Sequence, residues 1–275
     1  MKLARGRTAA LLVAACVMFG VGACGSGGTG TGSAGASGTP GVVATSPKPP
    51  EPKELLLSSL AVYDKGVYAV DYAGRDSSGS AVVDAARKQA YMKLVSTVQD
   101  SKLTMEALAI EPDTYLKLNV GELAKLPGMQ QLNGKSWMHI DRSKVNDPST
   151  LGVAFDDPDT LGLTALLKSA QSVQQAGDHK FSGTLDLAEG EGTPVTDEAV
   201  VKALGAKAAT VPFTATLDAE GRLTELLIDV PAAGATKPHQ LKMTVTQYGT
   251  VTIPAKPTGK AVIEAPAKVY EFLNG

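Results

Sequence analysis

The feature that most constrains the fold of this chain is a period-two alternation of apolar and polar residues, which recurs from Val67 onward. Successive side chains of a β-strand point to opposite faces, so this alternation predicts strands with one apolar face and one face in water. The clearest cases are 181–187, 211–218 and 241–246, and weaker ones run through 67–75, 79–84, 89–97, 102–110, 114–118, 136–141, 222–230 and 249–253.

Short turns separate these segments, and helical patterns are few. Turn residues stand at 77–79, 111–113 and 218–221, so consecutive strands should pair as an antiparallel meander. Helical spacing is found in 55–64, after Asp157 with Pro158 at the first helical position, and in 197–206; residues 121–128 form at most a short turn.

Some ten strands with one apolar face therefore have about three short helices to cover them. Strands twist by roughly 20–25° against their neighbours, so a sheet of this size curls. We expect a mainly β member of the α+β class, with a curved antiparallel half-barrel sheet wrapped over a few short helices. Incomplete cover would leave an apolar cavity between sheet and helices, and a fully packed core without a cavity is the alternative.

The N-terminus has the three parts of a secretory signal peptide, which predicts a leader over residues 1–23. Lys2, Arg5 and Arg7 precede an uncharged apolar stretch, which is too short to span a hydrocarbon layer of ~30 Å. The sequence Val-Gly-Ala-Cys that ends at Cys24 resembles the bacterial lipobox, whose cysteine receives diacylglycerol before cleavage. The alternative is an ordinary signal peptide cut near Ala23, with an incidental cysteine.

The residues after Cys24 favour the lipid anchor over ordinary secretion. Residues 25–41 contain only Gly, Ser, Thr, Ala and Pro, so they have too little apolar surface to form a core. We expect a disordered tether over 24–54 and a folded domain over 55–275. The other cysteine, Cys16, belongs to the leader, so the mature chain would have no internal disulfide.

Charge excludes some classes of partner. The formal net charge is −2, and removal of the three leader cations makes it more negative. No basic stripe suited to nucleic acid occurs, and no polybasic segment suited to an anionic membrane surface. The lipid on Cys24 is therefore the expected contact with the membrane, at its extracytoplasmic face.

An ordered set of segments resembles the LppX/LprAFG family of actinobacterial lipoproteins, which are similar in shape to the LolA and LolB lipoprotein carriers. The resemblance covers roughly 55–257, and order and spacing match better than residue identities. The segments are GVYAVDYAG, AYMKLV, KLTMEAL, DTYLKL, SWMHID, LTALLKSA, SVQQAGDHKFSGTLDL, FTATLDAEGRLTELLIDV and LKMTVTQYGTVTIPAKP.

This resemblance implies a curved antiparallel sheet over helices, with a cavity for acylated lipids and no catalytic residues. Only the lipobox cysteine, Cys24, carries over as a functional position. The chain departs from the family pattern in an acidic, proline-containing loop at 142–160 and in a tail at 259–275.

Patterns of catalytic or metal-binding chemistry are not found. His139, His179 and His239 do not stand at metal-ligand spacing, and the sequence has no nucleophile elbow and no phosphate-binding loop in a suitable context. The carboxylates of Asp156, Asp157 and Asp159 favour helix capping over calcium binding. We therefore expect a non-enzymatic protein without cofactor or metal. For Trp137 we expect packing in the core, with stacking on a ligand as the alternative.

Strand parity predicts which side chains would face a ligand in the cavity. They are Leu94, Met105, Leu116, Met138, Phe181, Leu185, Phe213 and Met243. The flexible methionines, including Met92, suit variable apolar partners. One function is thus a carrier or sensor of an apolar or acylated ligand in the cell envelope. The other is a structural or adaptor lipoprotein that contacts another envelope protein through a packed domain.

Overall fold

The computed structural model describes residues 50–98, 101–153, 159, 161–190, 196 and 198–274, which belong to one compact unit. The predicted leader, Cys24 and residues 25–49 of the predicted tether lie outside the described residues. The final residues of that tether, 52–54, form the first turn of a helix, so the helical structure begins before position 55.

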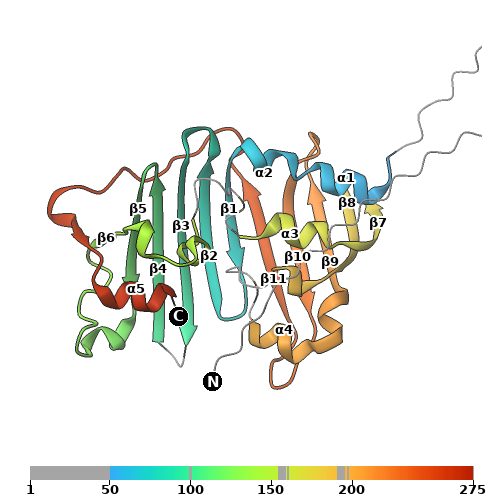
Figure 1. Ribbon diagram of the computed structural model, residues 1–275. Coiled ribbons are helices and arrows are strands. Elements are labelled where there is room, and N and C mark those ends of the chain that lie inside the picture. The colour runs from blue at the N-terminus through green and yellow to red at the C-terminus, as the bar shows by residue number, and fades with distance from the viewer. Residues whose placement is uncertain are drawn as a thin grey trace, which may run out of the picture. The chain divides into compact units, whose positions relative to one another are not determined.

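The described unit is built on one open sheet of twelve strands, in the order β12-β6-β5-β4-β3-β2-β1-β11-β10-β9-β8-β7 (Figure 1). Neighbouring strands are antiparallel except β6 and β12, which pair in parallel at one edge. The strands are β1 (Val67–Ala73), β2 (Ser77–Asp84), β3 (Gln89–Val98), β4 (Ser101–Ile110), β5 (Asp113–Asn119), β6 (Trp137–His139), β7 (Gln171–Gly177), β8 (Lys180–Leu185), β9 (Val211–Leu217), β10 (Leu223–Val230), β11 (His239–Thr246) and β12 (Val262–Glu264).

Five short α-helices accompany the sheet within the described part of the chain, and each contributes buried apolar residues to the same core. They are α1 (Pro52–Ser58), α2 (Ala61–Lys65), α3 (Leu163–Lys168), α4 (Glu198–Leu204) and α5 (Ala267–Asn274). Leu166 of α3 and Val269 of α5 have no exposed surface and pack in the cluster that holds the inward residues of the strands. Figure 1 shows α3 and α5 on the same side of the sheet. The predicted fold class, a mainly β sheet wrapped over a few short helices, is confirmed.

Several boundaries differ from the predictions. The helix expected over 55–64 is broken into α1 and α2 by a turn at Ser59 and Leu60. The strand expected over 249–253 does not form, since this stretch pairs with no strand and only Gly249 N–H donates to the Val67 carbonyl, at 2.8 Å. Asp157 lies outside the described residues, and the carboxylate of Asp159 accepts from the first amides of α3.

Three elements have no counterpart among the predictions. In the edge strand β7 only Val173 is partly buried, against the core, and the other six residues are exposed, so its sequence has no apolar alternation. The strand β12 is only three residues long, and α5 follows it in the tail. The tail packs on the loop at 142–153, where Asn274 accepts from Asn146 N–H at 2.8 Å and donates to the Lys144 carbonyl at 2.9 Å. The two departures from the family pattern are therefore in contact.

Candidate ligand-binding site

The side chains predicted to face a ligand all lie on the core face of the sheet. Leu94 pairs with Met105 across β3 and β4, and Leu116 pairs with Met138 across β5 and β6. Phe181, Leu185 and Phe213 form a second group on β8 and β9, while Met243 lies on the central strand β11. The structure thus places seven of the eight in two separate groups, with Met243 between them, rather than bringing all eight into one site.

Burial shows what surrounds these side chains. Leu116, Met138, Leu185 and Met243 have no exposed surface, and Phe181 and Phe213 have almost none. Leu94 and Met105 are half-buried and pack against the same core. A side chain without exposed surface touches protein atoms on all sides, so contact between these residues and a ligand stays a prediction that requires the core to open.

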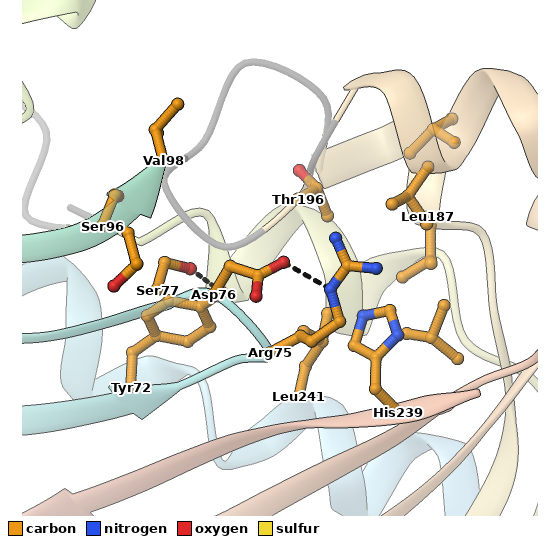
Figure 2. Close-up of a pocket in the computed structure, with 14 residues that line it drawn as sticks. Tyr72, Arg75, Asp76, Ser77, Ser96, Val98, Leu187, Thr196, His239 and Leu241 are labelled. Atoms are coloured by element: carbon orange, nitrogen blue, oxygen red, sulfur yellow. Dashed lines mark hydrogen bonds and ion pairs between the residues drawn. The ribbon is translucent and has the colours of Figure 1, made fainter. Parts of the chain in front are cut away.

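A pocket of about 490 Å³ lies elsewhere on the core side, where the ends of the central strands meet α4 (Figure 2). None of the eight predicted residues lines it. Its lining comes from β1, the β1–β2 turn, the ends of β2 and β3, the 3-10 helix η5 (Leu187–Gly190), α4, and the facing ends of β10 and β11. The lining residues are Tyr72, Arg75, Asp76, Ser77, Ser96, Thr97, Val98, Leu187, Thr196, Val200, Val201, Val230, His239 and Leu241.

The deeper wall of the pocket is apolar. Leu187, Val230 and Leu241 are buried residues of the core cluster, and Val200 of α4 belongs to the same cluster. Strand parity places Tyr72 and Leu241 on the core face, because Tyr72 lies opposite Met243 and Leu241 lies two residues before it. The wall is thus the part of the core face that α4 approaches without covering it completely.

The outer rim of the pocket is polar, and its groups are held by local contacts. The Tyr72 hydroxyl lies 2.9 Å from Ser77 Oγ, and Thr97 N–H donates to the Asp76 carbonyl at 2.8 Å. Arg75 Nε donates to the Asp76 carboxylate, and both side chains are exposed. Figure 2 shows the terminal nitrogens of Arg75 directed away from Asp76, with the His239 ring beside the guanidinium.

The histidines are in three different environments. His239 lines the pocket, with Nδ1 3.2 Å from the Lys237 carbonyl oxygen, while His179 is exposed in the turn between β7 and β8. His139 lies on the outer face of the sheet, where Nε2 is 3.1 Å from Asp113 and Nδ1 is 3.4 Å from Glu264. Within the described part of the chain, no group of three ligands is placed to hold a metal ion.

The outer face also carries Trp137, contrary to the expectation that it packs in the core. Its ring is half-buried beside Lys117, whose Nζ lies 4.6 Å from the ring centroid. Parity explains this position, because Met138 points into the core and the residues next to it must point outward.

Sequence reasoning missed Arg75 and His239 as rim residues. A turn Arg-Asp pair and a histidine at a strand start are common surface features, and no periodicity singles them out. Tyr72, Leu187, Val230 and Leu241 had a usable signal, since the alternation of their segments places them on the core face.

No protein-family model matches the chain, and no curated protein matches its sequence. Among the residues that the structure describes, no helix has both the length and the hydrophobicity needed to cross a bilayer.

Proposed function

We propose that this protein is an exported lipoprotein, held at the extracytoplasmic face of a membrane by lipid on Cys24, which binds an apolar or acylated ligand. The observation that carries the ligand-binding part is the pocket beside α4, with its apolar wall and polar rim. Its volume of about 490 Å³ lies within the range of roughly 300–1,000 Å³ typical of small-molecule sites. An apolar wall favours a hydrocarbon group, and a polar rim keeps the other end of the ligand in water.

The resemblance to the LppX/LprAFG lipoproteins is part of this proposal. A curved, open sheet with short helices on its core face is compatible with a fold of that type. The anchor part of the proposal is supported by the order of leader, lipobox-like cysteine and small-residue tether in the sequence.

The contacts around the rim favour binding over catalysis. A catalytic serine or threonine requires a base within hydrogen-bond distance. Among the described contacts, His239 bonds only with the Lys237 carbonyl, and Ser77 Oγ bonds with the Tyr72 hydroxyl. We therefore propose a non-enzymatic role that needs no cofactor.

The experiment that tests ligand binding is native mass spectrometry of the full chain after gentle extraction, with a pocket-filling variant. Val201 is half-buried on α4 and lines the pocket, so Val201→Trp should occupy it and remove co-purified lipid. Filling existing space should cost little stability, and thermal melting checks this point. Ala203→Trp is the matched control, because Ala203 is exposed on the same helix and does not line the pocket. Lipid retained equally by both variants would contradict the proposed site.

The adaptor role remains the second candidate, because large apolar side chains are exposed away from the pocket. Phe272 of α5 is 69% exposed, and Leu123 and Leu126, on or beside the 3-10 helix η2 (Gly121–Lys125), are about half exposed. Exposed apolar side chains of this kind can contact a protein partner. A wild-type chain that is free of lipid after gentle extraction would favour this candidate over the carrier.

A further inference from the structure

The size of the pocket limits how much hydrocarbon it can hold. A water-sized group occupies about 30 Å³ in a liquid, and a methylene group is of similar size. The volume of about 490 Å³ therefore accommodates on the order of sixteen such groups. One acyl chain of up to about sixteen carbons fits this space, whereas two chains of about twelve carbons exceed it.

The arrangement of the lining gives such a chain a direction. Leu187, Val200 and Val230 are buried and form the apolar wall, while Arg75 and Asp76 have side chains that are 41% and 56% exposed at the rim. The hydrocarbon would lie against the wall, because its transfer out of water is favourable there. The head of the ligand would then lie at the rim.

The guanidinium of Arg75 is oriented for an anionic head. Asp76 holds Nε, and Figure 2 shows the two terminal nitrogens turned away from Asp76, toward Thr196 and Leu187. No described residue other than Asp76 pairs with Arg75. Two parallel N–H donors of an arginine match two oxygens of a carboxylate or a phosphate.

His239 lies on the same side of the pocket, and its Nε2 donates to an anion only when both ring nitrogens carry a hydrogen. Its Nδ1 lies against the Lys237 carbonyl, so Nδ1 carries the hydrogen and donates. Nε2 makes no hydrogen bond with a described residue, and in the protonated ring it becomes a further donor. Lys237, two residues earlier, is exposed and adds positive charge near this rim.

A cationic head is less suited to this rim. Asp76 is the only acid among the described lining residues, and its carboxylate already accepts from Arg75. A cation would have to compete with Arg75 for Asp76 while it lies close to the guanidinium, and like charges at such distances repel each other.

We infer that the pocket binds a single-chain anionic amphiphile, whose carboxylate or phosphate is held by Arg75 and His239 and whose chain lies along α4. This inference rests on the proposed function, since it assigns a ligand class to the same pocket. Arg75 and His239 are then the residues that select the head group, and the volume selects the number of chains.

The test is isothermal titration calorimetry on the whole chain carrying Cys24→Ser, which removes the predicted acylation site. The ligands share one chain and differ in the head: laurate, dodecyl phosphate, dodecanol and dodecyltrimethylammonium, each below its micelle concentration. We expect laurate or dodecyl phosphate to bind tightest, and the comparison of the two distinguishes a fatty acid from a lysophospholipid. Dilauroyl phosphatidate, with two chains, should bind more weakly than dodecyl phosphate.

Three rim variants and one control assign the effect to the rim. Arg75→Gln should weaken binding of the anions on the order of tenfold, because a charge-assisted bidentate contact is lost, and should leave dodecanol nearly unchanged. His239→Gln should have a smaller effect in the same direction. Arg87→Gln is the matched control, since Arg87 is exposed in the 3-10 helix η1 (Ala85–Arg87) and does not line the pocket. Arg75→Lys keeps the charge without the planar pair of donors, so it should restore anion binding only in part.

The outcomes separate the inference from the function on which it rests. Three results would overturn the inference and leave an apolar site in place. They are equal affinity for all four head groups, the highest affinity for dodecyltrimethylammonium, or equal affinity for dilauroyl phosphatidate and dodecyl phosphate. Absence of binding by every ligand in the folded wild-type chain would overturn the proposed function together with it.

Discussion

Leu116 and Leu241 show, at the scale of single residues, how the core face of the sheet differs from the pocket wall. Both point to the core side of their strands, as alternation predicts. Leu116 has no exposed surface and is enclosed by neighbouring side chains, whereas Leu241 also borders the space beside α4. The orientation of a side chain is therefore a local property, but contact with a ligand depends on what packs opposite.

A tryptophan at position 116 tests whether this part of the core is closed. Leu116→Trp should overpack the core and lower the free energy of unfolding by about 1–3 kcal/mol, as should Phe181→Trp. Leu123→Trp is the control, since Leu123 is exposed and its replacement should change the free energy of unfolding by less than about 0.5 kcal/mol. Chemical denaturation measures all three. Unchanged stability in Leu116→Trp would mean that the core opens there, as the predicted ligand contact requires.

At the scale of elements, the C-terminal segment is docked on the far edge of the sheet from β7. The strand β12 pairs in parallel with β6, and the Tyr270 hydroxyl of α5 accepts from Asp141 N–H at 2.9 Å. On the outer face, Lys256 and His139 both contact the carboxylate of Asp113, which ties this segment to β5 and β6. The hydrogen bond from Lys256, with His139, lowers the pKa of Asp113 below its usual value.

This lowered pKa predicts how docking of β12 depends on pH. A depressed carboxyl pKa contributes stability that is present above the ordinary value near pH 4 and is lost as pH falls through the lower folded value. The protection factors of the β12 amides should therefore fall in strong acid but not between neutral pH and about pH 5. Asp113→Asn should remove much of this acid dependence. Asp71→Asn is the control, since the Asp71 side chain is exposed on β1. An acid dependence that changes in Asp71→Asn and not in Asp113→Asn would contradict the assignment to Asp113.

At the scale of the whole molecule, the sheet domain and the predicted anchor have separate tasks. The proposed ligand site lies within the described unit, and the proposed anchor depends on Cys24, directly after the predicted leader. Position at the membrane would therefore come from the lipid, because the chain has no polybasic segment to attract an anionic surface.

Cys24→Ala tests this division directly. Without the sulfur no diacylglyceryl group can be attached, so the variant should lose labelled palmitate and should be either uncleaved or released from the membrane. Membrane fractionation with labelled palmitate measures both properties, and an alanine at Cys16, within the leader, is the control. Unchanged label and unchanged membrane retention in Cys24→Ala would rule out the lipid anchor.

The sequence by itself determined most strands, since the alternation at 181–185, 211–217 and 241–246 is a direct consequence of side chains that point to opposite faces of a half-buried sheet. Only the tertiary structure decided the edge strands β7 and β12 and the position of the pocket. The strand β7 carries no alternation because Val173 is its only partly buried residue. The strand β12 is too short for a pattern, and it pairs with a strand far away in the sequence. The pocket exists because α4 approaches the ends of β10 and β11 without filling the space beside them. The separation between α4 and these strand ends is set by packing between segments remote in sequence, which no local pattern encodes.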